Sequence, residues 1–353
     1  MSTAIISLPQ HVPELMLGAK GALANGHNVS AQPMLLQNMD LSALMQPQDD
    51  PYATGRQLVA NNSHLLPQPV FESSSTGSFH SVSGDMDKVV ADSRSLVRGL
   101  KRSDDNYKAT MRSISNATAK DEEWHVTHIK PMEDLIKSIH SDYQKNYAEI
   151  NKGATEFMKV THTALGTISN HIEAGSDGKI KFNLYEFAKS MHEQLQKYVV
   201  CSFPERKNDK QITEDMKAFA KNWPPKDAKI NPIYTFTGGD KELAFWEKKL
   251  GTGFKVEYKE SSGQIEVYPD LAPITEIYKL LQGTEARWVG SDTNAQAFQS
   301  LQSGIDSQKN AIDNSVTQLL EKFRQDNTSF ETLIQLLTKM VDDLHRYNMG
   351  YVQ

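Results

Sequence analysis

The chain has 353 residues, and its 38 Lys and Arg against 44 Asp and Glu give a formal net charge of −6. This acidic balance argues against nucleic acid as the main partner, because phosphate binding needs a concentrated basic surface. No apolar segment approaches the roughly 20 residues that a membrane-spanning helix needs. The single cysteine, Cys201, excludes an intrachain disulfide and a cysteine-based zinc site.

Residues 1–85 form a leader that is poor in charge and rich in proline. They hold only two cations, Lys20 and Arg56, and seven of the 14 prolines, a composition typical of flexible chain. The apolar run from Ala4 to Leu8 is too short for a cleaved signal peptide, and no cation precedes it. We therefore expect a flexible export leader or tether, with an ordinary disordered tail as the alternative.

Residues 86–121 are predicted to form an N-terminal helical hairpin. Apolar residues at spacings of three and four from Val89 to Leu100 predict an amphipathic helix. Ser103 and the two Asp that follow it are typical of a helix start, so we expect a second helix from there to about Ala119. Because the apolar stripe is thin, we expect the hairpin to pack on something larger.

Two long helices, in residues 122–174 and 291–353, are predicted to dominate the architecture. Apolar residues recur every seven positions in both segments, a pattern typical of a coiled coil. Neither helix can bury its stripe alone, so we expect the two to pair with each other in antiparallel orientation. The expected seam residues are Ile136, Tyr143, Ile150, Phe157, Ile312, Val316, Leu319, Phe323, Phe330, Leu333, Leu337, Met340 and Leu344.

Two charged residues interrupt this seam. Lys309 and Asp326 occupy positions where the repeat calls for apolar side chains. We interpret them as polar layers that fix the register of the coil. The alternative is that the coil opens, or admits another helix, at these layers.

Residues 175–290 are predicted to form a mixed α/β insertion between the two long helices. Short strands are expected at 179–182, 254–258 and 265–267, the last two joined as a hairpin. Helices are expected at 184–198, at 213–223 with Thr213 as the cap, at 240–250 and at 273–281. The predicted fold class is therefore mainly α, with a small α/β insertion on a long antiparallel intramolecular coiled coil.

Motifs of catalysis and ligand binding are mostly absent. His125 and His128 form an HxxH pair without nearby carboxylate ligands, and the glycine pairs match no phosphate-binding loop. Cys201 lies in an apolar, strand-like run, where a small buried side chain is more typical than a nucleophile. We expect no catalytic, cofactor-binding or metal-binding residues, and we do not expect an enzyme.

The sequence resembles the needle-tip proteins of type III secretion systems, the hydrophilic translocators of the SipD, IpaD and BipD group. The resemblance covers roughly residues 120–345. It rests most on the segment from Trp288 through Asn294–Ser300 and on Leu319–Phe323 and Asn327. Supporting matches are Asp177-Gly178-Lys179, Ser202-Phe203-Pro204, Thr213-Glu214, Gly253-Phe254-Lys255-Val256 and Asp270–Ile274. Cys201 replaces the aliphatic residue usual in that group.

The resemblance implies a non-catalytic protein that is secreted to the needle tip at the bacterial surface, after a cytoplasmic stage. About five copies would cap the needle and contact the needle subunit and hydrophobic translocator proteins. Some members of that group bind bile salts, which makes bile salts a further candidate partner. The hairpin would act as an intramolecular chaperone that covers the coil until assembly. The positions expected to contact the needle are Lys339, Asp342, Asp343 and Arg346, with Glu133 and Asp134 nearby. A coiled-coil surface protein of the structural or adhesin type, and an effector delivered to the host cell, are the alternatives.

Overall fold

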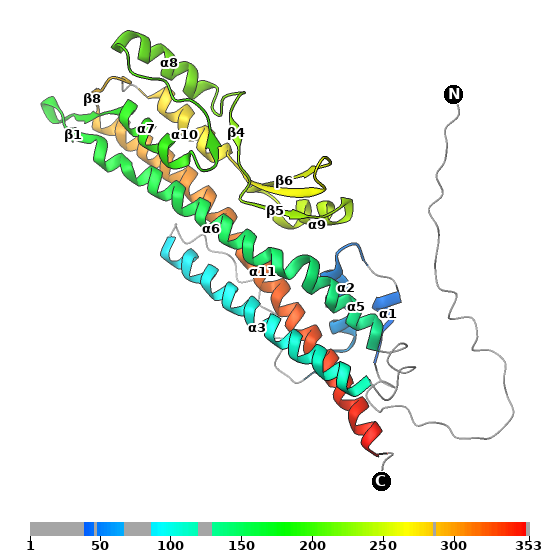
Figure 1. Cartoon of the computed structure of the whole chain (residues 1–353). Helices are drawn as coiled ribbons and strands as arrows, with labels where there is room; N and C mark the ends of the chain where they lie inside the picture. Colours follow the sequence, from blue (N-terminus) through cyan, green and yellow to red (C-terminus); the bar gives the residue numbers. More distant parts are fainter. Residues whose placement is uncertain (1–38, 46–47, 67–85, 119–128, 285–286, 351–353) are drawn as a thin grey trace, which may run out of the picture.

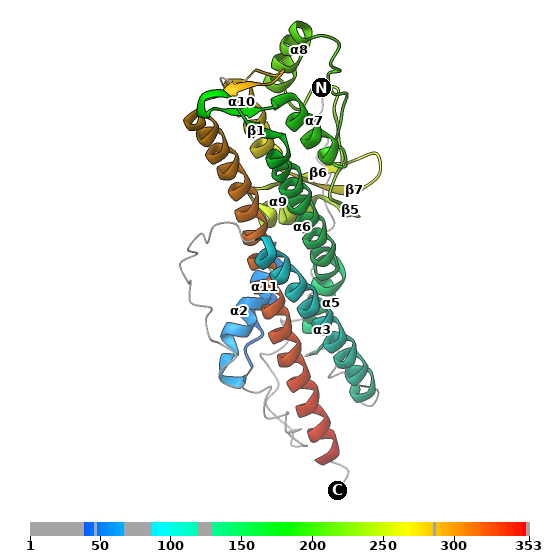
Figure 2. The same ribbon diagram turned by 90° about the vertical axis from the view of Figure 1, so that its left-hand side faces the viewer.

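The computed structural model describes residues 39–45, 48–66, 86–118, 129–284 and 287–350. Two long helical arms run side by side in opposite directions, and a smaller α/β part sits at one end of this rod (Figures 1 and 2). The protein is thus mainly helical with small antiparallel sheets, and the predicted fold class is confirmed. No helix within the described ranges is long and apolar enough to cross a membrane.

The first arm consists of α5 (Lys130–Ser138), the π-helical segment η4 (Ile139–Gln144) and α6 (Lys145–Gly166). Pro131 lies in the first turn, where its missing N–H costs no hydrogen bond. The second arm is α11 (Ala295–Gly350), whose 56 residues extend about 84 Å at 1.5 Å per residue. The two arms pack through their apolar stripes, as the sevenfold spacing predicts.

Residues 86–118 form one uninterrupted helix, α3 (Met86–Thr118). The predicted break at Ser103 is therefore wrong. Ser103 is buried, and its hydroxyl bonds to Gly99 O (3.0 Å) within the helix and to Glu331 Oε1 (2.7 Å) of α11. A serine whose hydroxyl is satisfied in this way is tolerated in a helix interior. The helix lies along the lower half of α11 (Figure 1).

Part of the predicted flexible leader is ordered. Residues 39–66 contain α1 (Ser42–Met45), α2 (Pro51–Asn61) and η2 (Ser63–Leu65). Asp50 caps α2 by accepting a hydrogen bond from Tyr52 N, and Pro51 occupies the first turn. The expectation of flexible chain is wrong for 48–66, because buried side chains such as Tyr52 and Leu58 anchor this segment. Apart from 39–45, the rest of the predicted leader lies outside the described residues.

The α/β part contains three small antiparallel sheets, with strand orders β1-β2-β8, β3-β4 and β5-β7-β6. The expected hairpin is present as β6 and β7, paired from Phe254–Pro269 to Lys259–Gln264. The helix expected to begin at Thr213 begins earlier, because Asn208 provides the cap by accepting from Gln211 N. The elements are η5 (Thr167–His171), β1 (Ile172–Ala174), η6 (Ser176–Gly178), β2 (Ile180–Phe182), α7 (Leu184–Leu195), β3 (Val199–Val200), α8 (Asp209–Lys221), β4 (Lys229–Ile230), β5 (Tyr234–Thr237), α9 (Asp240–Leu250), β6 (Phe254–Lys259), β7 (Gln264–Pro269), α10 (Ala272–Gly283) and β8 (Ser291–Thr293).

A glycine allows the α/β part to approach the first arm closely. A Cβ atom on Gly153 of α6 would lie 2.8 Å from the backbone oxygen of Ile233, which directly precedes β5. Only a residue without a side chain permits this contact. Gly153 thus serves the packing of the α/β part on the coil.

Candidate functional site

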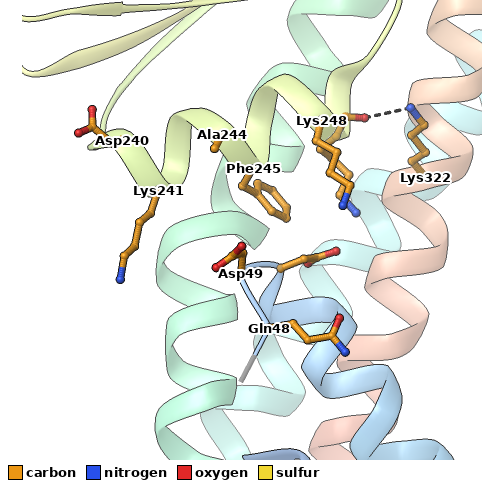
Figure 3. Close-up of a pocket in the computed structure, with 10 residues that line it drawn as sticks. Gln48, Asp49, Asp240, Lys241, Ala244, Phe245, Lys248 and Lys322 are labelled. Atoms are coloured by element: carbon orange, nitrogen blue, oxygen red, sulfur yellow. Dashed lines mark hydrogen bonds between the residues drawn. The ribbon is translucent and has the colours of Figure 1, made fainter. Parts of the chain in front are cut away.

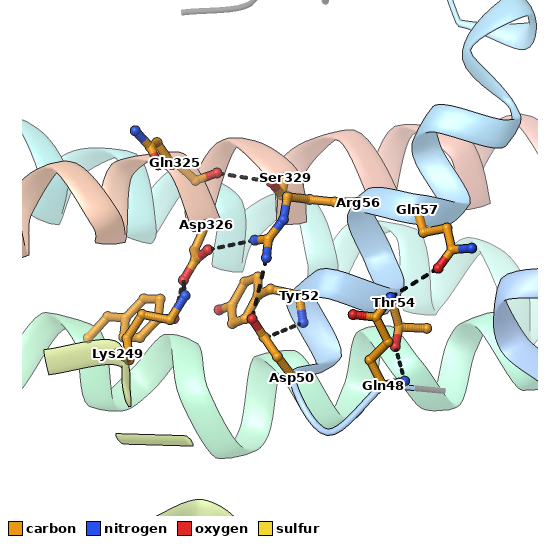
Figure 4. A network of polar contacts seen from close by, with 11 residues as sticks. Gln48, Asp50, Tyr52, Thr54, Arg56, Gln57, Lys249, Gln325, Asp326 and Ser329 are labelled. Carbon is orange, nitrogen blue, oxygen red and sulfur yellow. Dashed lines mark hydrogen bonds and ion pairs between the residues drawn. The ribbon is translucent and has the colours of Figure 1, made fainter. Parts of the chain in front are cut away.

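Asp326 of α11 is the point where four separate elements meet. Its side chain is buried, with a residue exposure of 3%. One carboxylate oxygen pairs with Arg56 of α2 at 3.1 Å, and the other pairs with Lys249 of α9 at 2.6 Å. Tyr147 of α6 donates its hydroxyl to the same carboxylate at 2.5 Å. Figure 4 shows the contacts of Asp326 with Arg56 and Lys249.

Aromatic rings close this polar cluster off from water. Tyr52 of α2 stacks on Tyr147 with centroids 5.7 Å apart, and Tyr147 stacks on Phe323 at 4.0 Å. Trp246 of α9 meets the Tyr147 ring edge-on at 5.4 Å. Burial, reinforced by the nearby Asp326 carboxylate, raises the pKa of both tyrosines well above its usual value. Tyr147 therefore remains a neutral hydroxyl that donates to Asp326.

A cavity of about 810 Å³ lies beside this cluster, between α2, α9 and α11. Its wall includes Phe245 and Ala244, while Lys241 and Lys248 carry positive charge to it (Figure 3). Lys322 of α11 also reaches this wall, where its Nζ donates to the backbone oxygen of Lys249 at 3.1 Å. Asp49, Asp50 and Asp240 also line the cavity, which thus combines an apolar surface with charges of both signs. Its lysines could pair with the anionic group of an amphiphile.

Helix α3 is held on the coil by polar contacts as well as by apolar packing. The hydroxyls of Thr110 and Thr338 lie 3.0 Å apart, which links α3 to α11. His140 Nε2 lies 2.7 Å from Asp104 Oδ1, which links α3 to the π-helical segment of the first arm. The Tyr107 ring stacks on the His140 ring with centroids 3.9 Å apart. Helix α3 is therefore bound to both arms.

The predicted seam residues lie where the helices meet. Every one of them with a described side chain is buried, namely Ile136, Tyr143, Ile150, Phe157, Ile312, Val316, Leu319, Phe323, Phe330, Leu333, Leu337 and Met340. The side chain of Leu344 lies outside the described residues. Of the two charged seam positions, Lys309 is half-buried, whereas Asp326 is the buried centre described above.

Comparison with known proteins identifies the family. A family model described as "Type III secretion systems tip complex components" matches residues 28–344. The chain belongs to the type III secretion tip-complex family. This result confirms the resemblance to needle-tip proteins and the assignment to type III secretion and virulence. It also favours a tip-complex component over the adhesin-like and effector alternatives.

Solved structures of similar proteins were also found. BipD of Burkholderia pseudomallei, in a near-atomic resolution structure, is 18% identical, with 74% of this chain and 78% of that chain covered at a TM-score of 0.47. Another BipD structure, described as an invasion protein associated with type III secretion, is 17% identical, with coverage of 73% and 78% and a TM-score of 0.46. A Chromobacterium violaceum protein titled "Pathogenicity island 1 effector protein" is 17% identical, with coverage of 83% and 80% and a TM-score of 0.44. The search of curated proteins gave no match.

In this tip-complex protein, the residues expected to contact the needle lie on the last turns of α11. Asp342 and Arg346 are exposed, and Asp343 is half-buried. Lys339 is half-buried, and its Nζ donates to the backbone oxygen of Leu65 at 2.6 Å. Lys339 is therefore engaged by the N-terminal segment that follows α2.

The expected neighbours of these residues lie at the start of α5. Glu133 is half-buried, and Asp134 is exposed and pairs with Lys130 at 2.7 Å. Helix α11 extends beyond the start of α5 (Figures 1 and 2). The last turns of α11 therefore project past Glu133 and Asp134.

Sequence reasoning missed the partners of Asp326 and a second polar contact across the coil. Arg56 and Lys249 are 270 and 77 residues away from Asp326 in the chain, so no local spacing indicates these pairs. His162 Nε2 of α6 lies 2.5 Å from Asp313 Oδ1 of α11, and both side chains are almost fully buried. The one available signal for Asp326 was its charge at an apolar heptad position.

Cys201 does not have the environment of an activated nucleophile. Burial raises the pKa of the Cys201 thiol, which opposes formation of the reactive thiolate. Within the described ranges, no group of three or more His, Cys, Asp and Glu side chains could hold a metal ion. His125 and His128 lie outside the described residues. The family is one of structural secretion components, in agreement with the expected non-catalytic role.

Proposed function

We propose that this protein caps the needle of a type III secretion system, controls secretion, and supports assembly of the translocation pore on host contact. It would be secreted to the needle end, assemble there in about five copies, and contact the needle subunit and hydrophobic translocator proteins. It would act by exchange of helices rather than by chemistry. The observation that supports this proposal most is the double cover of the lower part of α11 by α2 and α3.

The two covering segments contact the same stretch of α11. Helix α3 reaches it through Ser103, which bonds Glu331, and through Thr110, which contacts Thr338. On the α2 side, a Cβ on Gly55 would lie 2.6 Å from Cδ1 of Leu333, so the Leu333 side chain packs directly against the backbone of α2. The needle contacts expected on α11 begin at Lys339, directly after this stretch. A needle subunit that packs here would have to displace at least one covering segment.

Helix α3 has the properties of a displaceable cover. Its buried apolar residues are few, and polar contacts supply much of the rest of its attachment to the arms. These contacts include hydrogen bonds of Ser93, Ser103 and Thr110. A helix with such a thin stripe depends on the surface that it covers for most of its stability. Another helix that offers the same apolar stripe could therefore replace it at moderate cost. We propose that 39–66 and 86–118 together perform the self-chaperone role.

A cross-link between α3 and α11 tests the exchange. We would introduce Thr110→Cys and Thr338→Cys into a Cys201→Ser background, since the two hydroxyls lie 3.0 Å apart and cysteine sulfurs at this place can bond. The bacterial cytoplasm is reducing, so the disulfide would form only after export. In a strain that lacks the natural gene, we expect the cross-linked protein to fail in contact-dependent red-cell lysis, and reductant to restore lysis.

The controls separate the exchange from the tip function itself. Each single-cysteine variant cannot form the cross-link and should lyse red cells normally. Normal lysis by a protein shown to be fully cross-linked would contradict the helix exchange. Normal lysis by the strain without the gene would contradict the tip function.

The cavity beside α9 supports bile salts as a further partner. A bile salt carries one apolar face and an anionic group, which match Phe245 and the lysines Lys241 and Lys248. Ala244→Trp would fill the cavity, whereas Ala295→Trp, at an exposed position at the start of α11, would serve as a control. We expect calorimetric binding of deoxycholate to be lost in the first variant and kept in the second. Unchanged binding in both would place the bile salt elsewhere.

A further inference from the structure

Helix α3 carries a ridge of positive charge on the face that points away from the coil. Its cations recur at spacings of three, four and seven residues, which places them on one side of an α-helix. From the first to the last, the ridge spans 18 residues of α3 or about 27 Å. All its members are exposed, and they are Arg94, Arg98, Lys101, Arg102, Lys108 and Arg112. We call this set the α3 ridge.

The acidic residues of α3 are partly turned toward protein neighbours. Asp92 lies 3.6 Å from Arg324 of α11, and Asp104 contacts both His140 and Lys108. Asp105 is the acid that interrupts the ridge. Two of the four acids of α3, Asp92 and Asp104, therefore contact neighbouring elements, whereas Asp87 and Asp105 are exposed together with the more numerous cations.

Most cations of the ridge have no counter-charge in the described part of the chain. Arg102 approaches Glu331 at 3.7 Å with a side chain that is 71% exposed, a weak surface pair. Lys108 pairs with Asp104 at 2.5 Å. The structure shows no ion pair between the other four ridge cations and any described residue.

The ridge contrasts with the charge of the whole molecule. Helix α3 carries seven Lys or Arg against four Asp, although the complete chain holds six more acidic than basic residues. An acidic protein with one concentrated basic strip is attracted to a negative surface in a single orientation. The strip, rather than the net charge, then determines which partner binds.

We propose that the α3 ridge binds the surface of a bilayer that contains anionic phospholipids. Four of its six cations are arginines, whose guanidinium groups bond phosphate oxygens in pairs. The ridge runs along one side of a single helix for about 27 Å, so it suits an extended array of headgroups rather than one small anion. Exposed Val97, 41% accessible, lies beside it and adds apolar surface at the level of the interface. Nucleic acid fits less well, because the acidic remainder of the chain would repel a polyanion that surrounds it.

The test uses the full chain and phosphatidylcholine vesicles with and without phosphatidylglycerol. We expect co-sedimentation only with the anionic vesicles, and we expect it to weaken steeply as salt rises to physiological strength. The triple variant Arg94→Glu, Arg98→Glu, Lys101→Glu should lose about tenfold or more in affinity, since each basic residue near an anionic surface contributes about 1 kcal/mol. Circular dichroism would verify that the variant keeps its helices.

A matched control changes the net charge equally at the far end of the molecule. Lys207→Glu, Lys210→Glu and Lys221→Glu alter exposed residues in and beside α8, and we expect this variant to bind anionic vesicles nearly as well as the unchanged chain. An equal loss in both variants would overturn the proposal, because net charge alone would explain it. Binding to uncharged vesicles, or equally strong binding to double-stranded DNA, would also overturn it. This experiment involves no needle, so its outcome is independent of the proposed tip function.

Discussion

Lys249 Nζ and Asp326 Oδ2 lie 2.6 Å apart and connect the α/β part to the second arm of the coil. Lys249 comes from α9 and Asp326 from the middle of α11. The pair adds to the other contacts of the α/β part with α11, such as the packing of α10 on α11 and of Trp246 on Phe323. The same carboxylate also binds Arg56 of the N-terminal segment. One buried acid thus holds the N-terminal cover and the α/β part to the same point of the rod.

The first prediction concerns this ion pair. Lys249→Met should lower the free energy of unfolding by about 3 kcal/mol, because a buried carboxylate that loses a cationic partner keeps its desolvation cost. Lys248→Met, an exposed neighbour on the same helix, should change it by less than about 0.5 kcal/mol. Urea unfolding followed by circular dichroism measures both. If the two variants lowered the free energy of unfolding equally, the Lys249–Asp326 pair would stabilise the fold no more than an exposed lysine does.

The sequence predicts the two long helices of the rod but not which N-terminal segments pack on them. The sevenfold spacing from Ile136 to Phe157 and along α11 is a local pattern that repeats many times, so both long helices could be anticipated. Helix α2 is short and has few apolar residues, and it depends on tertiary contacts such as that of Gly55 with Leu333. Its Asp50-Pro51 start was nevertheless a readable signal.

The continuity of α3 and the cluster around Asp326 depend on distant residues. A Ser-Asp-Asp sequence fits a helix start and a helix interior equally well. Here Ser103 lies in a helix interior, where its hydroxyl donates to Glu331 of α11 instead of capping a new helix. Likewise, the charge of Asp326 in the seam was visible, but its partners come from segments far away in the chain. Such pairs follow from the tertiary fold and not from any local spacing.

The second prediction concerns the hydroxyl of Ser103. Ser103→Ala should weaken the docking of α3 by about 1–2 kcal/mol, because Glu331 loses a hydrogen bond in a partly buried site. Ser95→Ala changes an exposed serine of the same helix and should have little effect. Limited proteolysis would show α3 cleaved faster in the first variant than in the second. Identical cleavage rates would mean that apolar contacts alone hold α3.

The third prediction concerns pH and the α/β part. Burial against Phe203 and Phe219 lowers the pKa of His192 from its usual value of 6.5. The unfolded chain therefore takes up the proton first, so this contribution to stability is complete above pH 6.5 and declines as the pH falls through 6.5 toward the lowered pKa. His192→Gln should flatten the loss of stability between neutral and mildly acidic pH. His64→Gln, at an exposed position, should leave the dependence of stability on pH unchanged. If His192→Gln also left it unchanged, His192 would not be the source of this pH dependence.

The fourth prediction compares two glycines of the same helix. Gly153→Ala places a Cβ 2.8 Å from the backbone oxygen of Ile233, which is too close for any real contact. Since a backbone atom cannot move aside as a flexible side chain can, the chain before β5 must shift, and we expect a loss of about 1–3 kcal/mol.

Gly166→Ala is the matched control for this change. A Cβ at Gly166 meets nothing within 4 Å, and alanine has the better helix propensity, so we expect a gain of about 0.5–1 kcal/mol. A lower free energy of unfolding for Gly153→Ala and a higher one for Gly166→Ala, both measured by urea unfolding, would show that Gly153 is needed for the close approach of the α/β part to the first arm. If both variants were stabilised, the approach at Ile233 would be loose, and the α/β part would be held to the coil mainly by Lys249 and the aromatic rings around Tyr147.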